Sequence, residues 1–222
     1  MRRPVDLRVY ALLDPEHCRA RPLPELAAAT ARGGATLLQL RDKRSGTRAA
    51  VDAARAVALA LAPFGVPLLI NDRVDVALAA GAAGVHLGQT DMRPADARRL
   101  LGATALIGST VHHAAEADEL AADQVDYAGI GPVFATASKR NVDPPIGTAG
   151  VADLVVRLQR RKPGFPSCGI AGVSHANAGL VIAAGAAGVA VIADIFLADD
   201  VEAATRRLRQ VVDRALHERR AA

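Results

Sequence analysis

Aromatic residues are scarce in this sequence, which has four Phe, two Tyr and no Trp among 222 residues. Proteins that bind single-stranded nucleic acids use aromatic side chains for base stacking and usually gather basic residues on one face. Here the net charge is only +4, and the arginines are scattered apart from a cluster near the C-terminus. We therefore predict no nucleic-acid partner. A small positive net charge is compatible with binding of an anionic small molecule.

Cysteines and long apolar runs are also scarce. Cys18 and Cys168 lie far apart and in no CxxC motif, which argues against a disulfide scaffold or a zinc ribbon and favours a reducing compartment. The first residues hold no apolar run of signal-peptide length, and no stretch reaches the ~18 uncharged apolar residues of a membrane helix. We therefore expect a cytoplasmic protein with no membrane partner.

What the sequence does contain is a regular alternation of two kinds of segment. Short apolar, β-branched runs precede longer segments rich in Ala, Leu and Arg that have helical periodicity. The predicted strands are 8–13, 35–41, 67–71, 84–87, 105–108, 127–131, 167–170 and 188–192. The predicted helices are 23–32, 47–62, 74–80, 94–101, 114–122, 150–160, 175–184 and 201–218. This alternation predicts parallel strands joined by right-handed crossovers, closed into a (β/α)8 TIM barrel, an α/β fold that forms a single domain over residues 1–222.

An internal repeat supports the reuse of one βα unit. The sequence AAGAAGV occurs at 79–85 and again at 183–189, in each case where a helix ends and a strand begins. A doubly wound sheet also reuses such units. However, no GxGxxG motif follows the first strand, and no GxxxxGK[ST] motif occurs.

Polar residues gather at the ends of the predicted strands. In an α/β barrel the carboxyl ends of the strands, with the loops that follow them, carry the chemistry. The polar residues at these positions are Gln39, Arg41, Lys43, Asn71, Asp72, Gln89, Asp91, Ser109, Thr110, His112, Thr136, Ser138 and Lys139. We expect these cations and carboxylates to converge on one mouth of the barrel.

The spacing of these residues suggests roles for some of them. Arg41 and Lys43 share one face of an extended chain, and together they suit a phosphate or diphosphate, although they could instead pair with carboxylates. Asp72 and Asp91 are the candidate ligands of Mg²⁺, which proteins hold with one or two carboxylates plus substrate phosphates. Ordinary salt bridges are the alternative for these two residues. His112 is placed in the mouth, where it can hydrogen-bond a substrate or transfer a proton.

Two loops add possible anion sites. The stretch Thr136–Lys139 offers hydroxyls and an ammonium group, and residues 136–147 form a candidate lid. The stretch 169–174, GIAGVS, follows the seventh strand, where barrels frequently bind a phosphate; alternatively it is a turn that needs glycine.

Taken together, these segments resemble the thiamine phosphate synthase family along nearly the whole chain and in the right order. The matching segments are QLRDK (39–43), INDRVDVALAAGAAGVHLGQTDM (70–92), IGSTVH (107–112), DYAGIGPVFATASK (126–139), GIAGVSHAN (169–177) and GVAVIADI (188–195). The resemblance implies a (β/α)8 barrel. It also implies a transferase that joins hydroxymethylpyrimidine diphosphate to hydroxyethylthiazole phosphate through a pyrimidine carbocation, with release of diphosphate.

The resemblance also implies roles for individual residues. Arg41, Lys43 and Lys139 match the diphosphate ligands, and Asp72 and Asp91 match the ligands of Mg²⁺, the implied cofactor. The positions near the substrates are Gln39, Asn71, Thr110, Thr136, Ser138, Gly172, Ile192 and Ala193, with Lys139, Arg41 and Thr110 the candidate catalytic residues. A small homo-oligomer is a further implication.

Three departures from the family pattern affect mainly the thiazole-phosphate side. The chain has Thr110 and Ala193 where serines are expected, and Ala171 where the first glycine of a Gly-Gly pair is expected. Two other functions stay open at this point. One is a related thiazole tautomerase of the TenI type, which shares His112 but needs no diphosphate–metal pair. The other is a barrel that binds thiamine precursors without catalysis.

Overall fold

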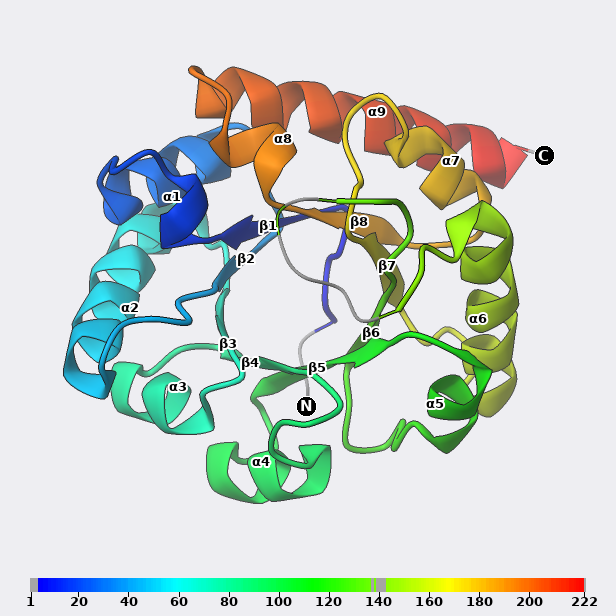
Figure 1. Cartoon of the computed structure of the whole chain (residues 1–222), viewed down its shortest axis with the longest axis horizontal. Coiled ribbons are helices and arrows are strands. Elements are labelled where there is room, and N and C mark those ends of the chain that lie inside the picture. The colour runs from blue at the N-terminus through cyan, green and yellow to red at the C-terminus, as the bar shows by residue number, and fades with distance from the viewer. Residues whose placement is uncertain (1–3, 137, 139–142, 222) are drawn as a thin grey trace.

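The computed structural model describes residues 4–136, 138 and 143–221. Within these ranges eight parallel strands form a closed barrel in chain order, with β8 paired to β1. The helices surround the strands (Figure 1). The strands are β1 (Val9–Leu13), β2 (Leu37–Leu40), β3 (Leu68–Asn71), β4 (Gly84–Leu87), β5 (Leu106–Val111), β6 (Tyr127–Ile130), β7 (Ser167–Ile170) and β8 (Gly188–Val191). The predicted (β/α)8 fold is confirmed.

The helices begin and end at the residues that favour such ends. Pro94 starts α4, and Gly81 ends α3 with a left-handed φ of 67°. Asp200 caps the last helix by accepting a 2.9 Å hydrogen bond from the Ala203 N–H. The α-helices are α1 (Leu23–Arg32), α2 (Thr47–Leu61), α3 (Val74–Ala80), α4 (Pro94–Leu101), α5 (Ala114–Glu119), α6 (Gly147–Arg161), α7 (Ala178–Ala183), α8 (Ala193–Phe196) and α9 (Val201–Ala221), and the 3₁₀ turns are η1 (Pro15–His17) and η2 (Ala62–Phe64).

Some predicted boundaries were wrong. The predicted strand 105–108 was too short at its end: β5 continues to Val111, and Ser109 and Thr110 still pair with β6. Helix α6 begins at Gly147 rather than residue 150. The short helix α8 was not predicted, because its four residues directly follow an apolar strand and are too few to show helical periodicity.

The strands separate two apolar cores. Successive strand residues point to opposite faces, so β1 sends Tyr10 and Leu12 into the barrel and Val9, Ala11 and Leu13 toward the helices. The interior core also receives a leucine each from β2, β3 and β5. This packing fills the barrel interior with side chains.

Both cysteines are free and buried, as expected for a chain without a disulfide scaffold. Burial raises the pKa of the Cys168 thiol to about 12 and that of Cys18 to about 11, so both stay protonated. In the described parts of the chain, no helix is both long and apolar enough to cross a membrane.

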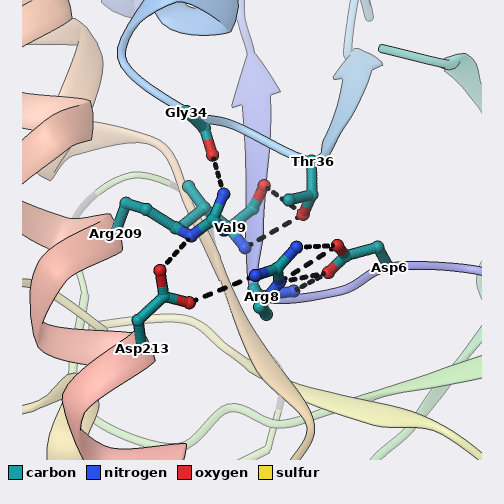
Figure 2. A network of polar contacts seen from close by, with 7 residues as sticks. All are labelled: Asp6, Arg8, Val9, Gly34, Thr36, Arg209 and Asp213. Atoms are coloured by element: carbon teal, nitrogen blue, oxygen red, sulfur yellow. Dashed lines mark hydrogen bonds and ion pairs between the residues drawn. The ribbon is translucent and has the colours of Figure 1, made fainter. Parts of the chain in front are cut away.

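A network of ion pairs joins the last helix to the first strand at the amino ends of the strands (Figure 2). On α9, the Arg209 Nε donates to Asp213 over 2.7 Å and its Nη1 donates to the Gly34 carbonyl over 2.9 Å. Asp213 also faces Arg8 at 3.4 Å, and Arg8 chelates Asp6. Burial opposes ionisation of Asp6, but the hydrogen bonds from Arg8 outweigh it and the pKa of Asp6 is lowered.

We predict that Arg209→Ala lowers the free energy of unfolding by about 1 kcal/mol, because it removes hydrogen bonds to Asp213 and to the Gly34 carbonyl at a partly exposed site. Activity should not change, because the network lies at the opposite end of the strands from the cavity described below. The measurement is urea unfolding. Arg206→Ala, which removes a more exposed i,i+4 pair with Glu202, is the matched control and should cost less. Equal losses in the two variants would contradict this account of the network.

Candidate active site

A cavity of about 680 Å³ opens at the carboxyl ends of the strands. Of the predicted residues within the described ranges, Ser109 does not line it and the others do; these are Gln39, Arg41, Lys43, Asn71, Asp72, Gln89, Asp91, Thr110, His112, Thr136, Ser138, Gly172, Ile192 and Ala193. Lys139 lies outside the described residues, and so does part of the candidate lid 136–147. Residues far apart in the sequence therefore meet in one place, because parallel strands bring their carboxyl ends to the same mouth.

Two carboxylates face each other on this mouth. Asp72 follows β3 and has a left-handed φ of 60°, a conformation that Asp adopts more readily than most residues. Its N–H donates to the His86 carbonyl over 2.9 Å, which fixes the turn after the strand. Asp91 follows β4, and its Oδ2 accepts a 2.7 Å hydrogen bond from the Gly88 N–H. The Asp91 carboxyl lies within hydrogen-bonding reach of the Asp72 carboxyl.

The environment of this pair suits a cation. Burial, and then the proximity of Asp91, raise the pKa of Asp72, although Lys43 opposes the shift with its Nζ 2.5 Å from Oδ2. Among the described residues there is no group of three or more His, Cys, Asp or Glu that could hold a metal ion. A cation at Asp72 and Asp91 would therefore need oxygens from a ligand and from water, which is how Mg²⁺ is usually held.

Arg41 is held by a carboxylate that the sequence analysis did not identify. The Arg41 guanidinium forms an ion pair with Asp14, whose side chain is only 1% exposed. Asp14 also accepts a 3.0 Å hydrogen bond from the Glu16 N–H at the start of η1. This arrangement fixes the Arg41 guanidinium at the cavity wall before any anion binds.

Two histidines contribute differently to the cavity. His86 lies inside β4, and its Nε2 is 2.8 Å from the Thr110 hydroxyl on β5. His112 follows β5, and its Nδ1 is 3.0 Å from Glu116 at the start of α5. Glu116 also accepts a 2.6 Å hydrogen bond from the His112 N–H, so it fixes both the backbone and the ring. The Glu116 carboxylate favours a proton on Nδ1 of His112.

The loops after β6 and β7 pack closely on the other side of the cavity. The Phe134 N–H donates to the Ala171 carbonyl over 3.1 Å. Both Ala171 and Gly172 have left-handed φ angles, of 72° and 66°. A Cβ on Gly172 would lie 2.6 Å from the Ala135 carbonyl oxygen, so only glycine permits this approach.

A second contact joins the β7 loop to the end of β8. Asp194, in the first turn of α8, accepts hydrogen bonds from the His175 backbone N–H at 2.9 Å and from its Nδ1 at 2.8 Å. Ile192 and Ala193 begin this turn and line the cavity. The two loops that would face a phosphate are thus fixed relative to each other.

Several of these supporting residues could have been found from the sequence, and others could not. Asp14 directly follows the first strand, so the rule that chemistry lies at strand ends points to it. Glu116 lies four residues after His112, which is a helical spacing. His175 and Asp194 are on different loops, and no local pattern links them.

A closed parallel barrel with a polar cavity at the carboxyl ends of its strands is the architecture of a (β/α)8-barrel enzyme. A sequence model of the family described as thiamine monophosphate synthase matches residues 9–195. The chain belongs to this family.

Individual relatives are similar over almost their whole length. The thiamine-phosphate synthase of Agrobacterium fabrum is 50% identical over 215 residues, which is 97% of this chain and 98% of the relative. That of Xanthobacter autotrophicus is 48% identical, with 96% and 98% covered. Among solved structures, a thiamine phosphate pyrophosphorylase from Pyrococcus furiosus matches with a TM-score of 0.83 and 30% identity, over 96% of this chain and 98% of that one.

We predict that Gly172→Ala lowers the free energy of unfolding by about 2 kcal/mol, because the new Cβ strains a left-handed backbone and collides with the Ala135 carbonyl. Urea unfolding measures this loss. Gly179→Ala in α7 is the control, since nothing lies within 4 Å of its added Cβ, and it should be neutral or stabilising. Similar losses in both variants would show that the close approach at Gly172 is unimportant.

We predict that Asp91→Asn lowers the pKa of Asp72, because an amide that can donate a hydrogen bond replaces a neighbouring acid. Lys43→Met should raise this pKa further. NMR of the labelled Asp72 carboxyl carbon measures both shifts. Because the pKa lies above its ordinary 3.8, Asp72 takes up a proton at a higher pH than a free Asp, and its negative charge is lost as pH falls through that raised pKa. An unchanged Asp72 pKa in both variants would contradict the proposed interactions.

Proposed function

We propose that this chain joins 4-amino-5-hydroxymethyl-2-methylpyrimidine diphosphate to 4-methyl-5-(2-hydroxyethyl)thiazole phosphate, giving thiamine phosphate and diphosphate. The bond between the pyrimidine methylene carbon and the diphosphate oxygen breaks first, and both electrons leave with the oxygen. The lone pair of the thiazole nitrogen then forms the new C–N bond. The observation that carries this proposal is the meeting of Asp72, Asp91, Arg41 and Lys43 in one cavity of a chain from the thiamine monophosphate synthase family.

The diphosphate end of the substrate is assigned to the cations of the cavity. The Arg41 guanidinium, fixed by Asp14, offers paired donors to phosphate oxygens, and Lys43 adds a point charge beside Asp72. Lys139 is assigned to the same leaving group. Departure of the diphosphate is the difficult step, and negative charge develops on its oxygens. Positive groups placed there lower the activation free energy of that step. Thr110 donates a hydrogen bond there, and Gln39, Asn71 and His112 contact the substrates.

Mg²⁺ fits the carboxylate pair. Asp72 and Asp91 lie close enough that the proximity of Asp91 helps to raise the pKa of Asp72, and a divalent cation between them would relieve that repulsion. The bound ion would neutralise charge on the diphosphate oxygens. The chain's own task is to hold both carboxylates, which the turn after β3 and the Gly88 N–H do.

The thiazole phosphate is assigned to the opposite wall of the cavity. Thr136 and Ser138 supply hydroxyls, and Gly172, Ile192 and Ala193 supply backbone at the loops after β7 and β8. Ala193 has no hydroxyl, so the backbone and the β6 loop carry more of the phosphate binding here. A cytoplasmic location and a homo-oligomeric state stay predictions.

The deciding experiment incubates the purified protein with both precursors and Mg²⁺. Thiamine phosphate and an equal amount of diphosphate are expected, and both should disappear when the metal is chelated. A thiazole tautomerase using His112 would isomerise its substrate without releasing diphosphate. A non-catalytic binding barrel would give neither product. Either result would overturn the proposal.

We predict that Asp72→Asn and Asp91→Asn each lower kcat on the order of a hundredfold, because each removes a charged ligand of Mg²⁺ where the leaving-group charge develops. Raising the Mg²⁺ concentration should recover part of the loss. The measurement is the initial rate of diphosphate release. Asp96→Asn, at an exposed position of α4 that pairs with Arg99, makes the same chemical change outside the cavity and should keep full activity. Full activity in either cavity variant would remove the metal assignment.

A further inference from the structure

A chain of buried polar side chains crosses the barrel interior at the base of the cavity. It runs from Gln39 on β2 through Tyr10 on β1 and Tyr127 on β6 to His86 on β4, and it ends at Thr110 on β5. Both tyrosines are fully buried, and the other members are at most 7% exposed. Gln39, His86 and Thr110 line the cavity, so the tyrosines lie behind the residues that a ligand would touch.

The interior is shaped to hold this chain. The rings of Tyr10 and Tyr127 meet edge to face, with centroids 5.7 Å apart and planes at 87°. A side chain at Gly108 on β5 would collide with the Tyr127 ring, and a Cβ on Gly129 would lie 3.1 Å from the His86 Cε1. Glycine at these two strand positions leaves room for the Tyr127 and His86 rings. Barrel interiors are more often filled by branched aliphatic side chains.

Each tyrosine hydroxyl has one proton and can therefore donate one hydrogen bond. Burial, and for Tyr127 also the neighbouring Tyr10, raise the pKa of both phenols well above the ordinary value. Both phenols therefore keep their single proton. Because both hydroxyls are buried, each phenol that accepts a hydrogen bond from one neighbour satisfies its own proton by donating to the other, which gives the chain a direction.

The amide at one end sets that direction. The Gln39 Nε2 donates to the Tyr10 hydroxyl. Tyr10 then donates to Tyr127 across 2.8 Å, and Tyr127 donates to Nδ1 of His86 across 2.9 Å. With Nδ1 accepting, the proton of the neutral ring is on Nε2, which donates to the Thr110 hydroxyl across 2.8 Å. The Thr110 hydrogen is left to point to an acceptor in the cavity.

We propose that Tyr127 and Tyr10 are positioning residues, which together with Gln39 hold His86 as the Nε2–H tautomer and thereby make the Thr110 hydroxyl a hydrogen-bond donor to the bound substrate. The consequence for turnover rests on the function proposed above, in which Thr110 faces the departing diphosphate. In the opposite direction of the chain, Thr110 would donate to His86 and would offer the diphosphate only lone pairs.

The tautomer is measured without any substrate. In ¹⁵N-labelled wild-type protein, the His86 ring should show a protonated Nε2 and an unprotonated Nδ1. Tyr127→Phe keeps the ring but removes the donor to Nδ1, so both tautomers should become populated. Tyr10→Phe cuts the link to Gln39 but leaves the Tyr127 donor beside Nδ1, so it should weaken the preference for Nε2–H less than Tyr127→Phe does. A wild-type ring protonated on Nδ1 would by itself overturn the proposal.

The kinetic test separates positioning from general damage to the fold. Tyr127→Phe should lower kcat about tenfold, because loss of one hydrogen bond made in the transition state raises the barrier by about 1.4 kcal/mol. KM should stay within about twofold of the wild-type value. Tyr10→Phe should lower kcat less. Thr110→Val removes the hydroxyl itself, and Thr110→Ser restores it.

A double-mutant cycle links the tyrosine to the threonine. If Tyr127 acts through Thr110, adding Tyr127→Phe to Thr110→Val should lower kcat no further, whereas in the Thr110→Ser background it should again lower kcat about tenfold. Additive losses of kcat in the Tyr127→Phe/Thr110→Val double variant would refute the positioning role. Equal effects of Tyr127→Phe and Tyr10→Phe on the His86 tautomer and on kcat would refute it as well. Absence of thiamine phosphate from the wild-type reaction would instead refute the function itself, and the tautomer spectra would still decide the direction of the chain.

Discussion

Closure of the sheet on itself is the constraint on which the rest of this structure depends. Once β8 pairs with β1, every second strand residue must fit inside a space of fixed width, and every strand must end at the same mouth. Leu37, Leu69 and Leu106 fill interior positions toward the amino ends of their strands. Toward the carboxyl ends the interior becomes polar, with Gln39, His86 and Thr110. The change from apolar to polar along the barrel axis coincides with the cavity at the carboxyl ends of the strands.

The polar groups of the mouth are supported in pairs rather than singly. Arg41 is held by a buried Asp14, His112 by Glu116, and the loops after β7 and β8 by the contact of His175 with Asp194. Each pair leaves one member facing the cavity and the other behind it. Such pairing holds charged side chains in place in advance, which is the physical basis of electrostatic preorganisation.

Much of this architecture could be read from the sequence, because alternation of apolar runs with helical segments is a local signal. The residues at strand ends, such as Asp72 and Arg41, could be named for the same reason. The predicted fifth strand ended at residue 108, yet the backbone at Thr110 continues the ladder of β5. The tyrosine chain was not foreseen at all. Tyr10 and Tyr127 stand 117 positions apart, and only the circular order of the strands brings their hydroxyl groups together.

The pairing of the last strand with the first also has a consequence for biosynthesis. β1 is made before its partner β8 and before the α9 residues that bind Arg8 and the Gly34 carbonyl. Until they emerge, the first strand has one open edge and exposes apolar surface that the final fold covers. Completion of the barrel therefore waits until β8 and α9 have been made, and chaperone binding would be most useful in the interval before α9 docks.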